Sequence, residues 1–259
     1  MFNVASYLDK IGYTGPVKPT VATLRELQKR HLMRIPFDNT LTADAKRGFD
    51  VLNDVDIDVD AIFDAIVTYG RGGVCYETNG LFRRLLGEVG YDVRILGAGV
   101  IQVNREFGPD LEHIFNCVHL DGDIWLADVG LAGPSYLEPL RLTDEVQEQY
   151  GCQYRIVEQD GYHLIQRRPQ AADWSPMYRF VLKYRDIAEW AALVPKLVDF
   201  PVEVALVGTR IHSRAFDTGQ WVLIGKRFLT VDNGKEELRV LADRAKYADV
   251  VRQILTVDR

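Results

Sequence analysis

The chain has 259 residues, of which 47% are hydrophobic and 26% charged, a composition typical of globular proteins that excludes a disordered or fibrous one. Its 31 Lys and Arg against 37 Asp and Glu give a net charge of −6, the wrong sign for a protein that binds nucleic acid through phosphates. The three cysteines have no short repeated spacing, so neither a disulfide framework nor a C-x-x-C motif is expected.

The amino terminus has no basic stretch followed by an apolar run, which is the pattern of a signal peptide. No apolar run approaches the length of about 18 residues that a membrane-spanning helix needs. We therefore expect a cytoplasmic protein without a membrane partner. The sequence leaves the oligomeric state open.

The first third of the chain has helical periodicity. A short helix is expected after Asn3, and a second over residues 20–35, which Pro36 must end. A third begins at Asp58, carries apolar residues with the i, i+3, i+4, i+7 spacing, and ends at Gly70. These elements predict a helical N-terminal part.

From Tyr91 onward the segments become short and rich in β-branched and aromatic residues. Asp-Gly pairs at 121–122 and 160–161 predict antiparallel hairpins between them. Strands are expected over residues 93–103, 113–120, 123–129, 153–159 and 162–168. The last part predicts strands at 202–210 and 219–231, an Asn233-Gly234 turn, a strand through Val240, and a helix from Ala245 to Leu255.

The clearest local signal is the segment 71–80, which reads R-G-G-V-C-Y-E-T-N-G and places Cys75 in the first turn of a new helix. The N–H groups and the dipole of a helix start favour a thiolate, the nucleophile of cysteine catalysis, and can stabilise an oxyanion. The alternative is a small buried residue without reactivity. A dinucleotide-binding glycine motif is excluded, because a helix precedes the segment and Cys75 replaces the third glycine.

Hairpin geometry selects His113 from the five histidines of the chain. With a two-residue turn at Asp121-Gly122, Phe115 opposes Asp128, and His113 and Asp128 become diagonal neighbours with Cβ atoms about 7–8 Å apart. A base oriented by a carboxylate is what nucleophilic catalysis requires. Taken singly, each histidine has a structural role as its alternative, and a slip of one residue would separate the pair.

Two other kinds of site are not expected. The cysteines and His113 lack the paired short spacing of zinc ligands, so no metal is assigned. The chain has no G-x-S-x-G motif for a serine nucleophile.

Together, the segment 71–80, His113 and Asp128-Val129-Gly130 resemble the signature of the arylamine N-acetyltransferases, and the opening of the chain is also similar. The resemblance implies an α+β fold around a papain- or transglutaminase-like arrangement of Cys75, His113 and Asp128. It divides the chain into a helical bundle over 1–90, an antiparallel β-barrel over 91–194 and an α/β lid over 195–259.

The resemblance also implies a ping-pong reaction without a tightly bound cofactor. A thioester donor, either coenzyme A or the phosphopantetheine of an acyl carrier protein, acylates Cys75, and an aromatic amine then attacks to form an amide. Phe37 and Leu131 are candidate substrate-binding residues by their positions in the motifs, and packing is the alternative for each. No residues are assigned to binding the carrier of the acyl group.

Leu131 stands where a phenylalanine is common in the family, and residues 132–140, 149–152 and 158–162 resemble its amide synthase branch. In that branch a carrier-bound polyketide is released as an amide, often a macrolactam, as in ansamycin assembly. Three alternatives remain: an arylamine acetyltransferase that uses acetyl-CoA, a hydrolase in which water resolves the acyl-enzyme, and a binding module without catalysis.

Overall fold

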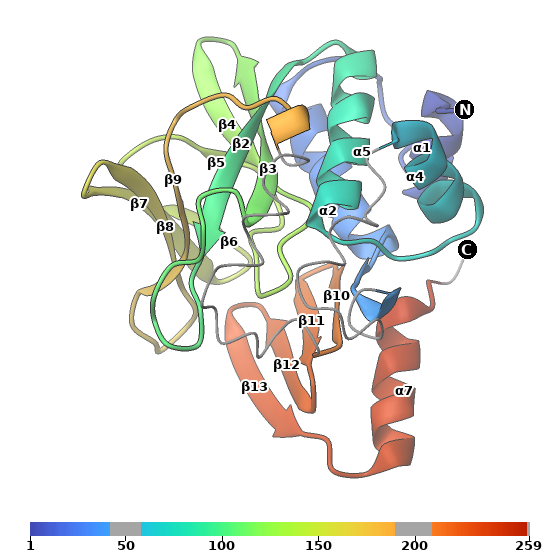
Figure 1. Cartoon of the computed structure of the whole chain (residues 1–259), viewed down its shortest axis with the longest axis vertical. Helices are drawn as coiled ribbons and strands as arrows, with labels where there is room; N and C mark the ends of the chain where they lie inside the picture. Colours follow the sequence, from blue (N-terminus) through green and yellow to red (C-terminus); the bar gives the residue numbers. More distant parts are fainter. Residues whose placement is uncertain (42–57, 190–208, 258–259) are drawn as a thin grey trace.

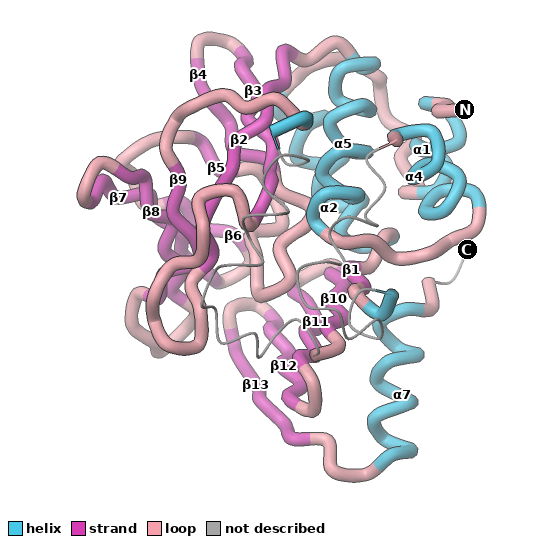
Figure 2. Tube along the Cα trace, viewed as in Figure 1, coloured by secondary structure: helices cyan, strands magenta, loops and turns pink. Residues whose placement is uncertain are grey.

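The computed structural model describes residues 1–41, 58–189 and 209–257. Within these ranges, helices lie beside a large antiparallel sheet, and a smaller sheet with its own helix lies below them (Figures 1 and 2). The helices are α1 Val4–Lys10, α2 Val21–Arg34, α4 Val59–Phe63, the π-helix η2 Asp64–Thr68, α5 Cys75–Val89 and α7 Arg244–Leu255. None of the helices in the described ranges has the length and apolar character needed to cross a membrane.

The predicted helix starts are confirmed by their caps. The side chains of Asn3, Thr20 and Asp58 each accept a backbone N–H from the first turn of the helix that follows. Helix α2 ends before Pro36, as predicted, because Ile35 is extended. The expected helix from Asp58 changes into the π-helix after Phe63, a local widening that its apolar spacing does not reveal.

The large sheet contains eight antiparallel strands in the order β5-β4-β3-β2-β9-β8-β7-β6. They are β2 Asp92–Val100, β3 His113–Leu120, β4 Asp123–Ala127, β5 Leu140–Arg141, β6 Gln147–Gln149, β7 Cys152–Gln159, β8 Tyr162–Arg168 and β9 Ser175–Phe180. The sequence missed β5, β6 and β9. The last of these carries Pro176 where the β8–β9 register shifts, and proline is unusual inside a strand.

Side chains complete the barrel where its two edge strands meet. Gln149 accepts from the Glu138 N–H at 2.9 Å and donates to the Glu138 carbonyl at 2.7 Å. Gln147 makes the same pair of bonds with Arg141 of β5, at 2.8 and 2.9 Å. A carboxamide carries the donor and acceptor of a peptide group, so these glutamines take the place of a strand-to-strand ladder and nearly close the barrel.

The predicted hairpin register is confirmed. Asp121 and Gly122 have φ of 53° and 85°, the conformation of a type I′ turn, and Leu120 pairs with Asp123. The Asp160-Gly161 and Asn233-Gly234 turns have positive φ in the same way. One detail differs: the β3–β4 ladder ends at the Asn116–Ala127 pair, so Asp128 lies just beyond the strand and not within it.

The smaller sheet has the order β1-β10-β11-β12-β13, with β1 Phe37–Asp38, β10 Ile211–Phe216, β11 Gly219–Ile224, β12 Arg227–Asp232 and β13 Lys235–Val240. The expected single strand over 219–231 is wrong, because a turn with Gly225 at φ 55° divides it into β11 and β12. Most of the expected strand at 202–210, and the expected boundary at 194/195, lie outside the described residues. Strand β1 joins the N-terminal part to this sheet through the Phe37–Ser213 pair.

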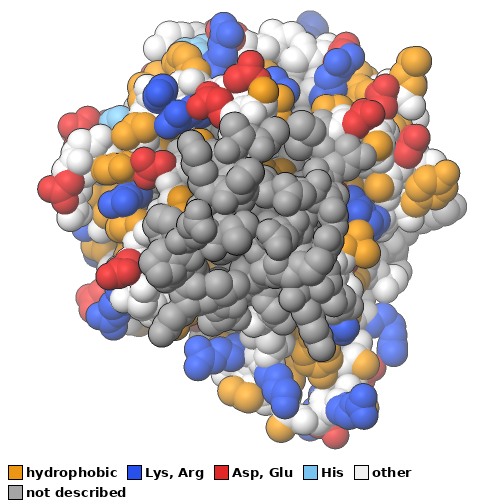
Figure 3. Space-filling model, in the orientation of Figure 1, with side chains coloured by type: hydrophobic (Ala, Val, Ile, Leu, Met, Phe, Trp, Pro, Cys, Tyr) orange, Lys and Arg blue, Asp and Glu red, His pale blue; other side chains and the backbone are white. Residues whose placement is uncertain are grey.

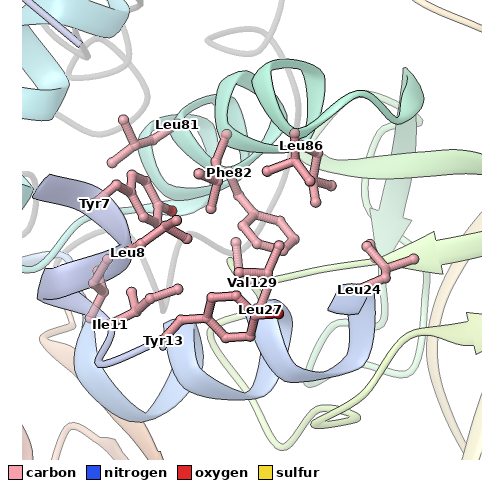
Figure 4. Close-up of a cluster of buried hydrophobic side chains, with 14 of the residues drawn as sticks. Tyr7, Leu8, Ile11, Tyr13, Leu24, Leu27, Leu81, Phe82, Leu86 and Val129 are labelled. Atoms are coloured by element: carbon pink, nitrogen blue, oxygen red, sulfur yellow. The ribbon is translucent and has the colours of Figure 1, made fainter. Parts of the chain in front are cut away.

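A buried cluster holds the helices against the barrel. Figure 4 shows side chains of α1, α2 and α5 pointing toward one another, with Val129 among them. Phe82, Leu86, Leu24 and Leu27 are fully buried there. Because Val129 directly follows Asp128, this packing fixes the start of the segment after β4 against helix α5.

Candidate active site

Cys75 is the first residue of α5, and the preceding loop is held by charge and by capping. The Glu77 carboxylate accepts the Val74 N–H at 3.0 Å and also forms a partly buried ion pair with Arg71. Cys75 itself is partly exposed, whereas Val74, Tyr76 and Glu77 are buried. The structure therefore presents the sulfur-bearing residue at a rigid helix start.

Gly72 and Gly73 lie in close contact with neighbouring residues. A Cβ at Gly72 would lie 2.6 Å from the Asp38 Cβ and 2.8 Å from the Pro36 carbonyl oxygen. A Cβ at Gly73 would lie 2.8 Å from a methyl carbon of Ile66. Any side chain is excluded at Gly72 by these contacts, and one at Gly73 would require Ile66 to shift, so the glycines let the loop before Cys75 lie against β1.

His113 and Asp128 meet as the hairpin geometry predicts. The His113 Nε2 lies 2.8 Å from the Asp128 Oδ2, and both side chains are buried. Burial lowers the pKa of His113, but the charge and hydrogen bond of Asp128, with a hydrogen bond to Cys75, outweigh it and raise the pKa to about 10. Burial alone raises the pKa of Asp128, but His113 and two further hydrogen bonds bring it below its usual value.

Asn79 fixes Asp128, a role that was not predicted from the sequence. Its amide nitrogen donates to the Asp128 Oδ1 at 2.9 Å and to the Ile114 carbonyl at 2.7 Å, and its amide oxygen accepts the Val129 N–H at 3.0 Å. Asn79 lies one turn after Cys75 on the same helix. Its place in the segment 71–80 was the available signal, but its partners are distant in sequence.

Gly130 brings the segment after β4 close to Cys75. A Cβ at Gly130 would lie 2.7 Å from the Cys75 Cα and 2.6 Å from the Asn79 Nδ2. The Gly130 N–H also donates to the Asp128 Oδ1 at 2.9 Å. The D-V-G sequence thus combines an acid, a core contact and a residue small enough to touch helix α5.

A cavity of about 400 Å³ opens beside these residues. Cys75 and His113 line it, and so do Phe37 and Leu131, the two residues expected from the motifs. Most of the other lining side chains are apolar, and the polar ones include Gln102, Glu112, Arg167 and Ser175. Ile211 and Ile224 of the smaller sheet form part of the wall. No local sequence pattern indicated these contributions from the C-terminal part.

A second cavity of about 1040 Å³ lies between α7 and the smaller sheet and includes neither Cys75 nor His113. Its wall carries four basic residues, Arg210, Lys226, Arg244 and Arg252. Lys and Arg side chains also gather at the lower end of the face shown in Figure 3, over the C-terminal elements. Of these two cavities, the smaller one contains both Cys75 and His113.

The other histidines lie outside the Cys75 cavity. His212 also has an acid partner, because its Nδ1 lies 3.1 Å from the Asp38 Oδ1, but the pair faces the second cavity. His31 is buried beside Tyr7, and burial lowers its pKa to about 3. His119 contacts Tyr184, and His163 lies near Glu158. Among the described residues, no three His, Cys, Asp or Glu side chains are grouped as metal ligands.

Comparison with known proteins gives consistent relationships along the whole chain. A sequence model of the N-acetyltransferase family matches residues 20–258. The chain is 40% identical over 260 residues to proansamycin X synthase of Amycolatopsis mediterranei (strain S699), which covers 100% of this chain and 98% of that protein.

Solved structures show the same relationship. The arylamine N-acetyltransferase of M. tuberculosis matches with a TM-score of 0.83 and 28% identity, covering 97% of this chain and 92% of that one. The arylamine N-acetyltransferase of Mycobacterium marinum in complex with CoA matches with a TM-score of 0.80 and 28% identity, covering 96% and 91%.

Proposed function

This chain belongs to the arylamine N-acetyltransferase family of acyltransferases, and from that premise we propose that it is an amide synthase with Cys75 as nucleophile, His113 as base and Asp128 as its orienting acid. The donor is a polyketide thioester on a carrier protein, released as an amide or macrolactam onto an aromatic amine. The identity with proansamycin X synthase over the whole chain supports this substrate class. The observation that carries the chemistry is the His113–Asp128 hydrogen bond beside Cys75 at the cavity wall.

In the resting site, His113 is protonated and is therefore an imidazolium. Its Nε2 is taken by Asp128, which leaves Nδ1 for the hydrogen bond to Cys75. A buried imidazolium stabilises a thiolate next to it, because the attraction between opposite charges is strong in a low-dielectric site. Together these three side chains form a papain- or transglutaminase-type arrangement.

In the first half-reaction, the Cys75 sulfur attacks the thioester carbonyl carbon. N–H groups of the first turn of α5 stabilise the oxyanion, and collapse expels the carrier thiolate, which takes the proton from His113. His113, having given its proton to the leaving thiolate, is neutral and able to accept a proton. The sulfur of the acyl-enzyme carries no charge, so the Cys75 contributions that raise the pKa of His113 are lost, while those of Asp128 remain.

In the second half-reaction, the amine nitrogen attacks the acyl carbon. The C–N bond forms, the C–S bond breaks, and His113 receives one N–H proton, which restores the imidazolium and the Cys75 thiolate. Phe37 and Leu131 border the space where both substrates must lie. The smaller sheet, which contributes Ile211 and Ile224 to the wall, acts as the lid.

A second candidate is an arylamine N-acetyltransferase that uses acetyl-CoA on small aromatic amines. The similarity to the M. marinum enzyme in complex with CoA favours a coenzyme A donor. A cavity of about 400 Å³ is also near the lower end of ligand-pocket sizes and suits a small acyl group. The two candidates share the chemistry of Cys75 and differ in the donor.

A donor panel tests the proposal. The enzyme is incubated separately with acetyl-CoA, a long acyl-CoA and an acyl carrier-protein thioester. The intact mass of the protein is measured each time, and the adduct is located by peptide mapping. A single acyl group on Cys75 from long carrier-bound donors supports the amide synthase. Rapid acetylation of anilines without turnover of long donors supports the second candidate, and an adduct confined to Cys117 or Cys152 refutes both.

The variant Leu131→Phe tests whether Leu131 borders the site of the acyl group, because a larger side chain narrows the cavity beside Cys75. We expect it to lower the acylation rate with long donors about tenfold or more and to change acetylation little, since steric exclusion acts on the bulkier substrate. Equal rates with both donors in this variant would remove Leu131 from the substrate-binding wall.

A further inference from the structure

Glu112 places a carboxyl group in the Cys75 cavity without a role in the chemistry described above. It directly precedes His113, the first residue of β3, and lines the same cavity. The Tyr76 hydroxyl, on the residue after Cys75, donates to the Glu112 carbonyl at 3.0 Å. Glu112 is therefore fixed to both the helix that carries Cys75 and the strand that carries His113.

The hydrogen bonds of Glu112 within the protein do not require its charge. Its Oε2 accepts the Val100 N–H at 3.2 Å and its Oε1 accepts from the Gln102 Nε2 at 2.8 Å. Glu112 thus provides a hydrogen-bond acceptor for the last backbone N–H of β2. Elsewhere in the same barrel, Gln147 and Gln149 satisfy strand ends with neutral carboxamides. A glutamine at position 112 could keep the bonds to Val100 N–H and Gln102 if the Gln102 amide turned over, at the cost of the 3.2 Å bond from the Gln102 Nε2 to the Val100 carbonyl.

A carboxyl group is costly at this position. Burial raises the pKa of Glu112, and the hydrogen bonds from Val100 and Gln102 and the charge of His113 only partly offset that effect. A carboxylate offers about four acceptor positions, of which the two described bonds occupy two. The remaining acceptor capacity lies beside a largely apolar cavity, where a substrate N–H has few other partners.

We propose that Glu112 positions the amine for the second half-reaction by accepting the N–H that the product amide keeps. A primary amine has two N–H bonds. As the C–N bond forms and the C–S bond breaks, one proton passes to His113, while the other stays on nitrogen and points to Glu112. The proposal rests on the proposed function and adds a binding residue for the acceptor amine.

This division of roles predicts a preference for primary amines. N-methylaniline has a single N–H, which must pass to His113, so it cannot also bind Glu112. A hydrogen bond to a charged acceptor is roughly twice as strong as one to a neutral acceptor. We therefore expect Glu112→Gln to lower kcat/KM for aniline about tenfold and for N-methylaniline less than about twofold.

The experiment first loads each enzyme with an acyl group and then measures aminolysis of the acyl-enzyme separately. Wild type, Glu112→Gln and the control Glu106→Gln, an exposed acid on the same loop, are each mixed with aniline and with N-methylaniline. Rates are divided by those of the same amines with a free thioester in solution. The expected result is a primary-to-secondary ratio reduced only in Glu112→Gln, with a loss in aminolysis by aniline that exceeds any loss in acylation, and Glu106→Gln equal to wild type in both steps.

An equal loss with both amines, or an equal loss in acylation and aminolysis, would mean that Glu112 is only structural and would overturn the inference. An unchanged aniline rate in Glu112→Gln would overturn it as well. If Glu112→Gln does not fold, the wild-type enzyme decides. If its aminolysis rates, divided by the solution rates, show no preference for aniline over N-methylaniline, the proposed role of Glu112 is contradicted. Absence of any acyl-enzyme in the wild type refutes the proposed function instead, which separates the two failures.

Discussion

Replacing Cys75 by alanine is expected to abolish amide formation and to leave no acylated protein. Without the sulfur, no covalent intermediate forms, and His113 and Asp128 have no nucleophile to activate. The measurement is the intact mass after incubation with a thioester donor, together with the rate of amide production. The fold should persist, because Cys75 is partly exposed and its helix cap is formed by Glu77.

The matched control is Cys117→Ala, which removes a fully buried thiol on β3 away from the cavity. This variant loses some core packing but should still be acylated at Cys75. If acylation persisted in Cys75→Ala and was lost in Cys117→Ala, the nucleophile would be Cys117 and not Cys75.

Replacing Asp128 by asparagine is expected to slow acylation by about three to four orders of magnitude, the size of effect seen for the orienting acid of serine proteases. Asparagine nearly keeps the shape of the side chain and can still accept from the Asn79 and Gly130 donors, so the fold should be retained. It removes the negative charge that holds His113 as an imidazolium. Single-turnover acylation measured by quenched mass spectrometry, with the melting temperature alongside, tests this expectation.

The pH dependence of the same reaction gives a second readout. In the wild type the pKa of His113 is raised to about 10, so the imidazolium persists below that pH and is lost as the pH rises through it. Without the Asp128 charge, burial lowers the pKa of His113, and the imidazolium should be lost at a lower pH. An Asp128→Asn enzyme with the wild-type rate and the wild-type pH profile would exclude Asp128 from the mechanism.

The parts of the fold that follow local rules were predictable from the sequence. The Asp121-Gly122 pair sets the turn type, the turn sets the β3–β4 register, and the register brings His113 to Asp128. Helix starts were equally predictable, because Asn3 and Asp58 cap the backbone next to them. These elements depend on contacts within a few residues along the chain.

Other parts depend on contacts between distant segments, which local patterns do not encode. The pairing of Phe37 with Ser213 joins residues far apart in sequence. The side-chain amide of Gln149 helps to close the barrel by forming hydrogen bonds with the Glu138 backbone in place of a backbone partner. Asn79 was visible in the motif, but its position between Ile114 and Asp128 exists only once the barrel packs on α5. The same packing creates the cavity and places Glu112 in its wall.

In the proposed reaction, an acyl group on Cys75 is an intermediate of amide formation. This can be tested by isolating the acylated protein free of donor, adding aniline, and following the protein mass and the amide together. We expect amide to appear at the rate at which the acyl mass disappears, and no slower than steady-state turnover. An acyl group that stays on the protein while turnover with fresh donor continues would contradict it.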